Sequence, residues 1–408
     1  MRSDAIAVTG IGLVTPAGLT AQDNWAALCQ GRSLAAHDPL LSGLPCDFSC
    51  QVPPFDAAAL FGRSRARRLD RFGHFALIAA RAAVIDSHLD PRSWNGERVG
   101  VVLGAASNSM QNYNSEFSQL LDGYPSRVSP LALPRSLPDT ASGEVALDLG
   151  AKGPSFATAA ACASGAVALS TARDLLRSGA CDIVLAGGSE SPLAPMTVAC
   201  FAQMGAISRR RDQPHLACRP FDAARDGLVL GEGAAVLVLE RPTAAKARRA
   251  PVKALLRGCG TTTDAHHPIA PHPTGDGAAR ALRIALKDSG CSPRDIGHIN
   301  AHGTSTRHND AAEAAALADV FGPDMPPVTA SKSIIGHAIG AAGAIEAAYT
   351  ILALQHQQVP PTANFAVQDG DHKLDIVSGA SRPVTMDTAI TCSFGFGGRN
   401  SAILLTTP

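Results

Sequence analysis

Residues 155–165 read Ser-Phe-Ala-Thr-Ala-Ala-Ala-Cys-Ala-Ser-Gly, a strand-like run that passes through small residues into a helical pattern over 164–177. This pattern predicts that Cys162 lies near the first turn of the helix, where the helix dipole and free backbone N–H groups favour a thiolate. Small neighbours leave room for a substrate to reach the sulfur, and N–H groups of the turn can stabilise an oxyanion. A buried structural cysteine is the alternative, and we prefer that interpretation for the other cysteines.

Outward from this segment, short apolar runs rich in β-branched residues alternate with Ala-rich helical patterns, which predicts an α/β fold with mixed or parallel sheets. Strands are predicted at Ile6–Val14, Val99–Leu103, Ser155–Ala161 and Asp182–Ala186, and a helix at Ala21–Cys29. After Glu240 the residues Arg241-Pro242-Thr243 interrupt the strand pattern before the same rhythm restarts. We therefore predict two similar halves, residues 1–245 with the nucleophile and residues 246–408 with the histidines described below.

The composition bounds the function. The 408 residues are 46% hydrophobic and 17% charged, enough to bury one large core or two fused ones. Lys+Arg and Asp+Glu are equal at 35 each, so no global field favours nucleic acid or an anionic membrane. The apolar runs are too short to span a bilayer, and no signal peptide is apparent. We expect a cytoplasmic protein with neither nucleic acid nor membrane as a partner.

The ten cysteines are scattered, which predicts reduced thiols rather than a disulfide framework. The pair Cys46 and Cys50 has no second pair or nearby histidine at metal-ligand spacing. We therefore expect no metal site.

Two histidines stand in settings that suit chemistry. His302 follows a predicted strand and precedes a glycine and a run of hydroxyl side chains. His337 lies five residues after Lys332 in a glycine-containing turn. A lone histidine is more often structural, but α/β proteins place catalytic groups at strand ends, and two such histidines accompany the cysteine.

Together these segments resemble the elongating beta-ketoacyl-acyl-carrier-protein synthases of the thiolase-like superfamily, and the resemblance spans nearly the whole chain. Further segments carry it: Val8-Thr9-Gly10-Ile11-Gly12, Gly187-Gly188-Ser189-Glu190, Arg219-Pro220-Phe221-Asp222, Gly231-Glu232-Gly233 and Ser393-Phe394-Gly395-Phe396-Gly397-Gly398. The resemblance implies a thiolase-like five-layered αβαβα fold made of two duplicated halves. It also implies that the protein works as a dimer.

The resemblance implies a decarboxylative condensation. Cys162 would carry the acyl group as a thioester, and His302 and His337, as neutral imidazoles, would donate hydrogen bonds to the enolate of malonyl-carrier. The Cys-His-His set distinguishes this class, because chain-initiating synthases have Asn in place of the second histidine and thiolases add a second cysteine.

Other positions take their roles from the same resemblance. Lys332 would order the histidine pair together with Glu346. The backbone N–H groups of Cys162 and Phe396 would form the oxyanion hole, and the Phe396 side chain would gate acyl entry.

Binding roles follow in the same way. Thr304 and Thr306 match positions that hydrogen-bond the pantetheine arm. Ser107 falls where the family lines its acyl tunnel, although it could equally cap a helix. Arg67, Arg68 and Arg210 resemble positions that hold the acidic carrier protein, although charge runs usually form solvated faces.

The family expectations include no bound cofactor, because the substrates ride on the phosphopantetheine of acyl carrier protein. The partner would be a second copy or a homologous chain-length-factor subunit. Ala160 and Arg399 depart from the usual fatty-acid pattern, which favours a type II polyketide or polyene pathway over housekeeping fatty-acid elongation. A non-catalytic chain-length partner is disfavoured, because Cys162, His302 and His337 are all present.

Overall fold

The computed structural model describes residues 5–107 and 110–408. Its large strands hydrogen-bond in one continuous order, which divides into two five-stranded sheets where β1 and β8 pair. The first sheet consists of β1 (Ile6–Val14), β4 (Val99–Gly104), β5 (Ser155–Thr158), β6 (Ile183–Glu190) and β7 (Gly233–Glu240). The second consists of β8 (Ala254–Thr263), β9 (His298–Asn300), β10 (Val328–Thr329), β13 (Thr388–Gly395) and β14 (Arg399–Thr406).

The two sheets repeat one topology. The strand order is β1-β7-β6-β4-β5 in the first and β8-β14-β13-β9-β10 in the second. In both, the first two pairings are antiparallel and the last two are parallel. The duplicated halves that the sequence predicts are therefore confirmed at the level of topology. Their predicted division between residues 245 and 246 falls within α10 (Pro242–Ala247), which joins β7 to β8, and stays a prediction.

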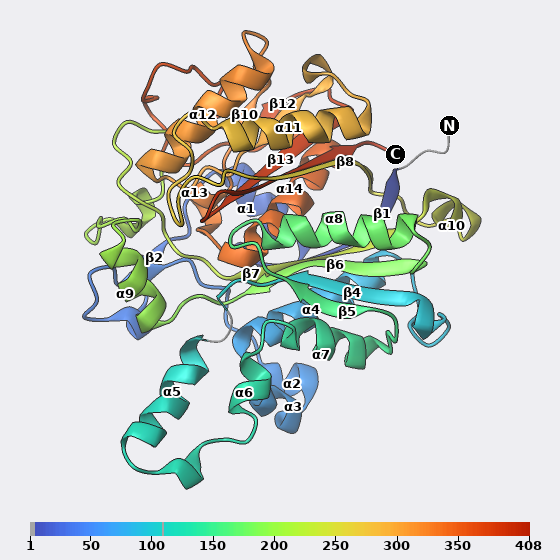
Figure 1. The fold of residues 1–408 in the computed structure, drawn as a ribbon, viewed down its shortest axis with the longest axis vertical. Helices are drawn as coiled ribbons and strands as arrows, with labels where there is room; N and C mark the ends of the chain where they lie inside the picture. The colour runs from blue at the N-terminus through green and yellow to red at the C-terminus, as the bar shows by residue number, and fades with distance from the viewer. Residues whose placement is uncertain (1–4, 108–109) are drawn as a thin grey trace.

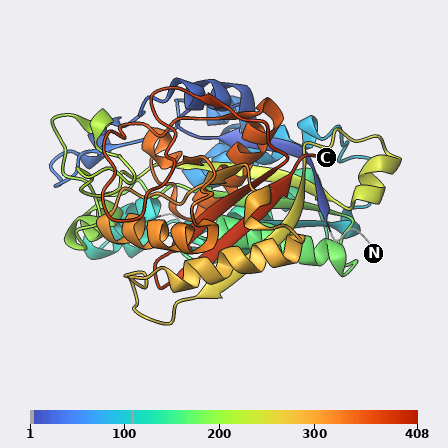
Figure 2. The ribbon, with the colours of Figure 1, turned by 90° about the horizontal axis from the view of Figure 1, so that it is seen from above.

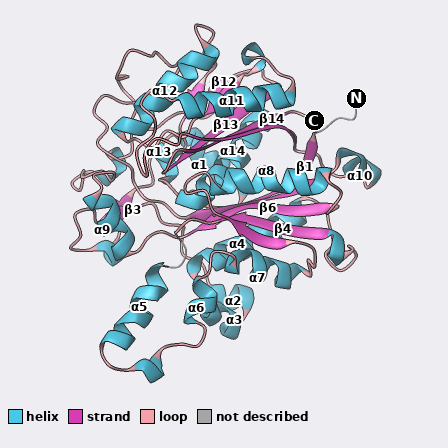
Figure 3. Ribbon diagram, viewed as in Figure 1, coloured by secondary structure: helices cyan, strands magenta, loops and turns pink. Residues whose placement is uncertain are grey.

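Helices cover both faces of both sheets and give five layers. Between the sheets lie α8 (Ser164–Arg177) and α14 (Ala342–His356), whose apolar residues join one core cluster with both sheets. The first sheet is covered outside by α4 (Arg71–Asp86) and α7 (Thr140–Leu149), and the second by α11 (Asp276–Ser289) and α12 (Arg307–Phe321). Figures 1 and 3 show this stacking, with α8 between the two sheets. The αβαβα fold is confirmed.

The central layer explains the long buried run in α14. Every residue of this helix from Ala342 to Leu354 is buried, as expected for a helix packed on all sides. By contrast α11, an outer helix, buries one side only. The start of β1 and the end of β14 lie on the same side of the molecule in both views (Figures 1 and 2), because both strands pair with β8.

The remaining elements are short or peripheral. They are α1 (Ala21–Gln30), α2 (Ala57–Phe61), α3 (Arg63–Arg68), α5 (Met110–Leu121), α6 (Ala132–Ser136), α9 (Pro195–Gln203), α13 (Lys332–Ile335), and the small strands β2 (Ala36–His37), β3 (Phe48–Ser49), β11 (Gln358–Val359) and β12 (Arg382–Pro383). Figure 1 shows α5 and α6 projecting from the layered body. No helix in the described part of the chain is long and apolar enough to cross a membrane.

Local patterns predicted several bounds well. The strand Ile6–Val14 and the helix over 164–177 occur as predicted. The strand predicted at Ser155–Ala161 ends earlier, at Thr158, which pairs with Gly104 at the end of β4, and Ala161 then adopts a left-handed backbone with φ of 49°. Strand periodicity cannot reveal such a turn when the residues are all small.

Glycines in β1 let α4 pack closely against the first sheet. A Cβ added to Gly12 would lie 1.8 Å from the carbonyl oxygen of Ala79 in α4, which is backbone and cannot move aside locally. We predict that Gly12→Ala lowers the free energy of unfolding by about 3 kcal/mol, because helix and sheet must separate. Urea denaturation measures this.

Gly143 in α7 provides the matched control. A Cβ there meets nothing within 4 Å, so Gly143→Ala should leave stability unchanged or raise it by up to about 1 kcal/mol through helix propensity. Equal stability of the two variants would contradict the packing argument.

Candidate active site

Cys162 sits on a tight turn between β5 and α8. The left-handed Ala161 reverses the chain, and the Ser164 hydroxyl braces the turn by donating to the Ala161 carbonyl at 2.6 Å and accepting from the Ala160 N–H at 2.8 Å. The Thr158 hydroxyl donates to the Ser164 carbonyl at 2.9 Å. These local bonds hold the cysteine at the helix start that the sequence predicts, with 4% of its surface exposed.

The end of β13 lies directly against this turn. A Cβ on Gly395 would lie 2.8 Å from the Ala160 carbonyl and 3.0 Å from the Cys162 nitrogen, so only glycine permits the approach. The next residue, Phe396, directs its backbone N–H at the Cys162 sulfur. Two segments more than 200 residues apart in the chain thus meet at the thiol.

His302 follows β9 and is held through its backbone. The buried Glu313 carboxylate accepts the His302 N–H at 2.7 Å and the Gly303 N–H at 2.8 Å. Sequence reasoning missed Glu313. A signal was available, because Asp310 and Glu313 stand three residues apart in an otherwise Ala-rich helix and therefore face the same side of α12.

His337 follows α13 and is fixed by backbone pairing with a remote segment. Its N–H donates to the Val229 carbonyl at 2.8 Å, and its carbonyl accepts from the Gly231 N–H at 3.0 Å. Both ring nitrogens of His337 are buried without a hydrogen-bond partner among the described residues. The ring is therefore available to a ligand.

The structure brings the predicted cysteine and both histidines together. The Cys162 sulfur and ring nitrogens of His302 and His337 all lie within 4.8 Å of one another. The two imidazoles meet edge to face, with centroids 5.3 Å apart at an interplanar angle of 84°. Cysteine and histidine at this spacing suit either a nucleophile with two hydrogen-bond donors or a zinc ion, so the chemistry needs further observations.

Lys332 organises one of the histidines. Its buried ammonium donates to the His302 Nδ1 at 3.1 Å, to the His302 carbonyl, and to the Glu346 carboxylate. An ammonium has no acceptor, so Nδ1 must accept and the ring proton must lie on Nε2. The Lys332 and Glu346 contacts that the resemblance implied are thus present as geometry.

Burial governs the protonation states. Desolvation, together with the nearby Lys332 charge, holds the pKa of both His302 and His337 well below the usual range, so both rings are neutral at pH 7. Burial raises the pKa of Glu346 to about 7, against the opposing effect of Lys332. The neutral tautomer with Nε2–H is therefore the state that His302 offers to a ligand.

The thiol behaves differently from the sequence expectation. Burial raises the pKa of Cys162 to about 11, although Lys332 and the Phe396 N–H both favour the thiolate. The position at a helix start does favour the anion, but removing the sulfur from water outweighs it. Burial therefore favours the neutral form of the Cys162 thiol at pH 7.

A cavity of about 560 Å³ leads to this cluster. The lining includes Cys162, Phe201, Thr304, Thr306, His302, His337, Ile269, Arg307, His308 and Phe396. The Thr304 and Thr306 hydroxyls hydrogen-bond each other at 2.9 Å, and the rings of Phe201 and Phe396 pack at 5.8 Å. The predicted pantetheine and gate residues therefore share one cavity with the thiol.

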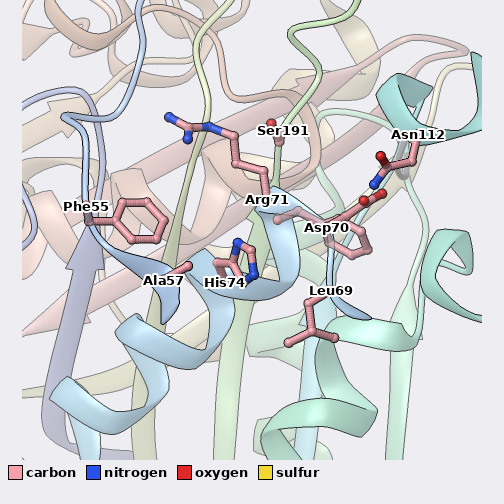
Figure 4. Close-up of a pocket in the computed structure, with 9 residues that line it drawn as sticks. Phe55, Ala57, Leu69, Asp70, Arg71, His74, Asn112 and Ser191 are labelled. Atoms are coloured by element: carbon pink, nitrogen blue, oxygen red, sulfur yellow. The ribbon is translucent and has the colours of Figure 1, made fainter. Parts of the chain in front are cut away.

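A second cavity, of about 330 Å³, lies beside the start of α4 (Figure 4). Asp70, Arg71, His74 and Ser191 face it, and burial raises the pKa of Asp70 to about 7. Arg71 is bound to Glu232, with 2.6 Å from its Nη2 to the carboxylate. Its lining residues among those described include no cysteine, unlike the first cavity.

The other predicted residues lie outside the main cavity. Ser107 is not among the lining residues, and its backbone N–H donates to Glu190 at 3.1 Å. Arg67 and Arg68 lie on α3, and Arg68 contacts Glu144 at 3.2 Å.

Arg210 lies closer to the cavity. Its guanidinium is 3.7 Å from Asp226, which lines the cavity. Arg210 therefore lies next to a residue that lines the cavity, whereas Arg67 and Arg68 lie on α3, whose residues are not among the cavity lining.

Comparison with known proteins bears on the choice between a nucleophile with two hydrogen-bond donors and a zinc site. Residues 3–245 match the family described as beta-ketoacyl synthase, N-terminal domain, and residues 253–366 match its C-terminal domain. The chain belongs to the beta-ketoacyl synthase family. It is an enzyme of the acyltransferase class, a setting in which the cluster fits a nucleophile with two hydrogen-bond donors.

Relatives cover the whole ketosynthase chain. A 3-oxoacyl-acyl-carrier-protein synthase 2 from Synechocystis is 41% identical over 98% of this chain and 97% of that protein. One from Staphylococcus aureus is 37% identical over 99% and 98%. Among solved structures, the ishigamide ketosynthase/chain length factor has a TM-score of 0.94 at 32% identity over 100% of both chains. A type II polyketide ketosynthase in complex with its acyl-carrier protein has a TM-score of 0.89 at 31% identity over 99% of both.

The raised thiol pKa predicts how Cys162 reacts with a small alkylating agent. Because the free site holds the neutral thiol, the rate of Cys162 alkylation by iodoacetamide should rise about tenfold per pH unit from pH 7 to 9. Peptide-resolved mass spectrometry separates this modification from that of the exposed Cys200. A rate that levels off below pH 8 would mean that the thiolate already dominates there.

Proposed function

We propose that this ketosynthase joins an acyl thioester to malonyl-acyl-carrier protein by decarboxylative Claisen condensation, giving beta-ketoacyl-acyl-carrier protein. The observation that carries the proposal is the convergence of the Cys162 sulfur and the two neutral imidazoles, within 4.8 Å, on a cavity of about 560 Å³. The names of the relatives support both the reaction and the carrier.

In the first step, the Cys162 sulfur forms a bond to the acyl carbonyl carbon. The bond from that carbon to the carrier's sulfur breaks, and the leaving sulfur takes up the thiol proton. Backbone N–H groups of Cys162 and Phe396 stabilise the transient oxyanion, in keeping with their position at the sulfur.

In the second step, malonyl-carrier loses carbon dioxide and its electron pair moves into an enolate. His302 and His337 donate hydrogen bonds to the enolate oxygen, and the tautomer set by Lys332 places the His302 proton on Nε2. The enolate carbon attacks the acyl carbonyl, the bond to Cys162 breaks, and the resulting thiolate takes up a proton from solvent. Glu346 and Glu313 support this arrangement as positioning residues.

We propose that the phosphopantetheine of the carrier delivers both substrates and that no free cofactor takes part. The hydroxyls of Thr304 and Thr306 would hydrogen-bond its amides, since both line the cavity. The placement of Ser107 in the acyl pocket stays a prediction. We expect action in the cytoplasm, because all ten cysteines are free thiols, which is typical of a reducing compartment.

We propose that the chain works as a homodimer or as a heterodimer with a homologous chain-length-factor subunit. Solved relatives include ketosynthases with chain length factors. The projecting α5–α6 segment supports a partner, because it exposes large apolar side chains that a monomer would rarely leave in water. These are Tyr113, Phe117, Leu120, Leu121, Tyr124, Leu131, Leu133 and Leu137.

For the pathway we favour type II polyketide or polyene synthesis. A type II polyketide ketosynthase is among the solved structures similar in fold, and Ala160 and Arg399 depart from the fatty-acid pattern. Fatty-acid elongation is the second candidate, which the similarity to 3-oxoacyl-acyl-carrier-protein synthase 2 fits. Intact-mass analysis of carriers after incubation with malonyl-carrier, with and without a co-expressed homologue, separates the two by product length.

The proposed roles predict different defects. Cys162→Ala should fold normally but form no acyl adduct from acyl-carrier, as intact-mass analysis will show. His302→Ala and His337→Ala should still load the acyl group but decarboxylate malonyl-carrier about 100- to 1000-fold more slowly, because each loses one donor to the enolate. Acylation at another cysteine, or wild-type decarboxylation by both histidine variants, would contradict these assignments.

Carrier docking through arginines gives a separate prediction. Charge reversal of Arg67, Arg68 and Arg210 to glutamate should raise the Michaelis constant for carrier substrates about tenfold at low salt and weaken its salt dependence. Arg92→Glu is the control, because Arg92 is exposed and pairs only locally with Asp90. If the triple variant and the control have the same kinetics at every ionic strength, these arginines form a solvated surface and do not bind the carrier.

A further inference from the structure

The turn that joins β13 to β14 brings Phe396 to the thiol and is anchored at its far end. Gly397 and Gly398 both have positive φ, 78° and 69°. The Gly398 carbonyl accepts from the Asp264 N–H at 2.9 Å and from the Asn400 amide at 3.1 Å. Asn400 also donates to the Asp264 carboxylate at 2.7 Å. This end of the turn is tied by hydrogen bonds to Asp264, which directly follows β8.

At the near end of the turn, Gly395 pairs with Arg399 across β13 and β14 and the Phe396 N–H is directed at the Cys162 sulfur; the Arg399 side chain adds one further restraint. The Phe396 carbonyl accepts a hydrogen bond from the Arg399 Nη1 at 3.1 Å. Among the described residues, this is the one hydrogen bond or ion pair of the exposed Arg399 guanidinium. The arginine therefore contacts the turn rather than a carboxylate.

Phe396 carries two groups that matter to the proposed reaction. Its backbone N–H points at the Cys162 sulfur, and its ring packs against Phe201 at 5.8 Å across the cavity wall. The N–H and the carbonyl flank the same Cα. Holding the carbonyl restricts the ψ rotation of Phe396 and so limits how far this residue can swing away from the end of β13.

We infer that Arg399 is a positioning residue that holds Phe396 in the orientation needed for the oxyanion hole and the cavity wall. This inference deepens the proposed function and rests on it. Arg399 touches neither the thiol nor the histidines, and it acts only through Phe396.

The test separates acyl loading from decarboxylation. Arg399→Met keeps the stem but removes the donor, while Arg399→Gln retains an N–H donor without the charge. Rapid-quench measurement of Cys162 acylation at saturating acyl-carrier should show about a tenfold loss for Arg399→Met, the size expected for one hydrogen bond to a charged donor. The half-saturation concentration should change less than twofold, and Arg399→Gln should recover most of the rate.

A second readout excludes a general structural defect. Decarboxylation of malonyl-carrier depends on the histidine pair rather than on Phe396, so Arg399→Met should leave its rate within twofold of the wild-type value. Arg92→Met, at an exposed ion pair with Asp90, is the control and should behave as wild type in both assays.

Three outcomes would overturn the inference. One is wild-type loading by Arg399→Met, and another is an equal loss of loading and decarboxylation. The third is a rise in the half-saturation concentration for acyl-carrier, with an unchanged acylation rate, that Arg399→Lys restores and Arg399→Gln does not. This result would mean that the guanidinium binds the carrier's phosphate. Failure of the wild-type chain to acylate Cys162 would instead defeat the proposed function itself.

Discussion

One buried ammonium, that of Lys332, constrains the rest of the site. A charge that is removed from water must be surrounded by acceptors, and here the Glu346 carboxylate, the His302 carbonyl and the His302 Nδ1 supply them. Burial, reinforced by this ammonium, keeps the pKa of both imidazoles low and the rings neutral, and the hydrogen bond from Lys332 fixes the proton of His302 on Nε2. The Lys332 charge thus decides that His302 can donate a hydrogen bond to a substrate from its Nε2.

The duplicated topology explains how distant segments reach one place. β5 and β10 occupy equivalent positions at the ends of the two sheets, and each leads into a central helix, α8 or α14. Cys162 lies in the first of these connections and His337 in the second. Since α8 and α14 pack together between the sheets, the two connections meet. His302 follows β9, beside β10, and joins them at the same strand ends.

The site combines a protonated thiol with donors that are already in place. Burial raises the pKa of Cys162 to about 11 in the free site, so an incoming thioester meets a neutral nucleophile. The Phe396 N–H and the Lys332 charge both favour negative charge on the sulfur or beside it. Negative charge that develops during acyl transfer therefore meets groups already oriented towards it, which lowers the barrier without rearrangement.

Strand and helix periodicity and short glycine-flanked motifs are local properties, so the residues alone were enough to predict the layered α/β class, the family and the candidate residues Cys162, His302, His337 and Lys332. The helix Ser164–Arg177 was predicted to its ends for that reason. Three features depend on residues that are remote in the sequence. Ala161 adopts a left-handed backbone, and Glu313 binds the backbone N–H of His302. Burial raises the pKa of the Cys162 thiol, although the helix start alone favours the thiolate. The desolvation free energy of a buried group depends on all the atoms packed around it, which come from many parts of the chain, so a local sequence pattern does not reveal it.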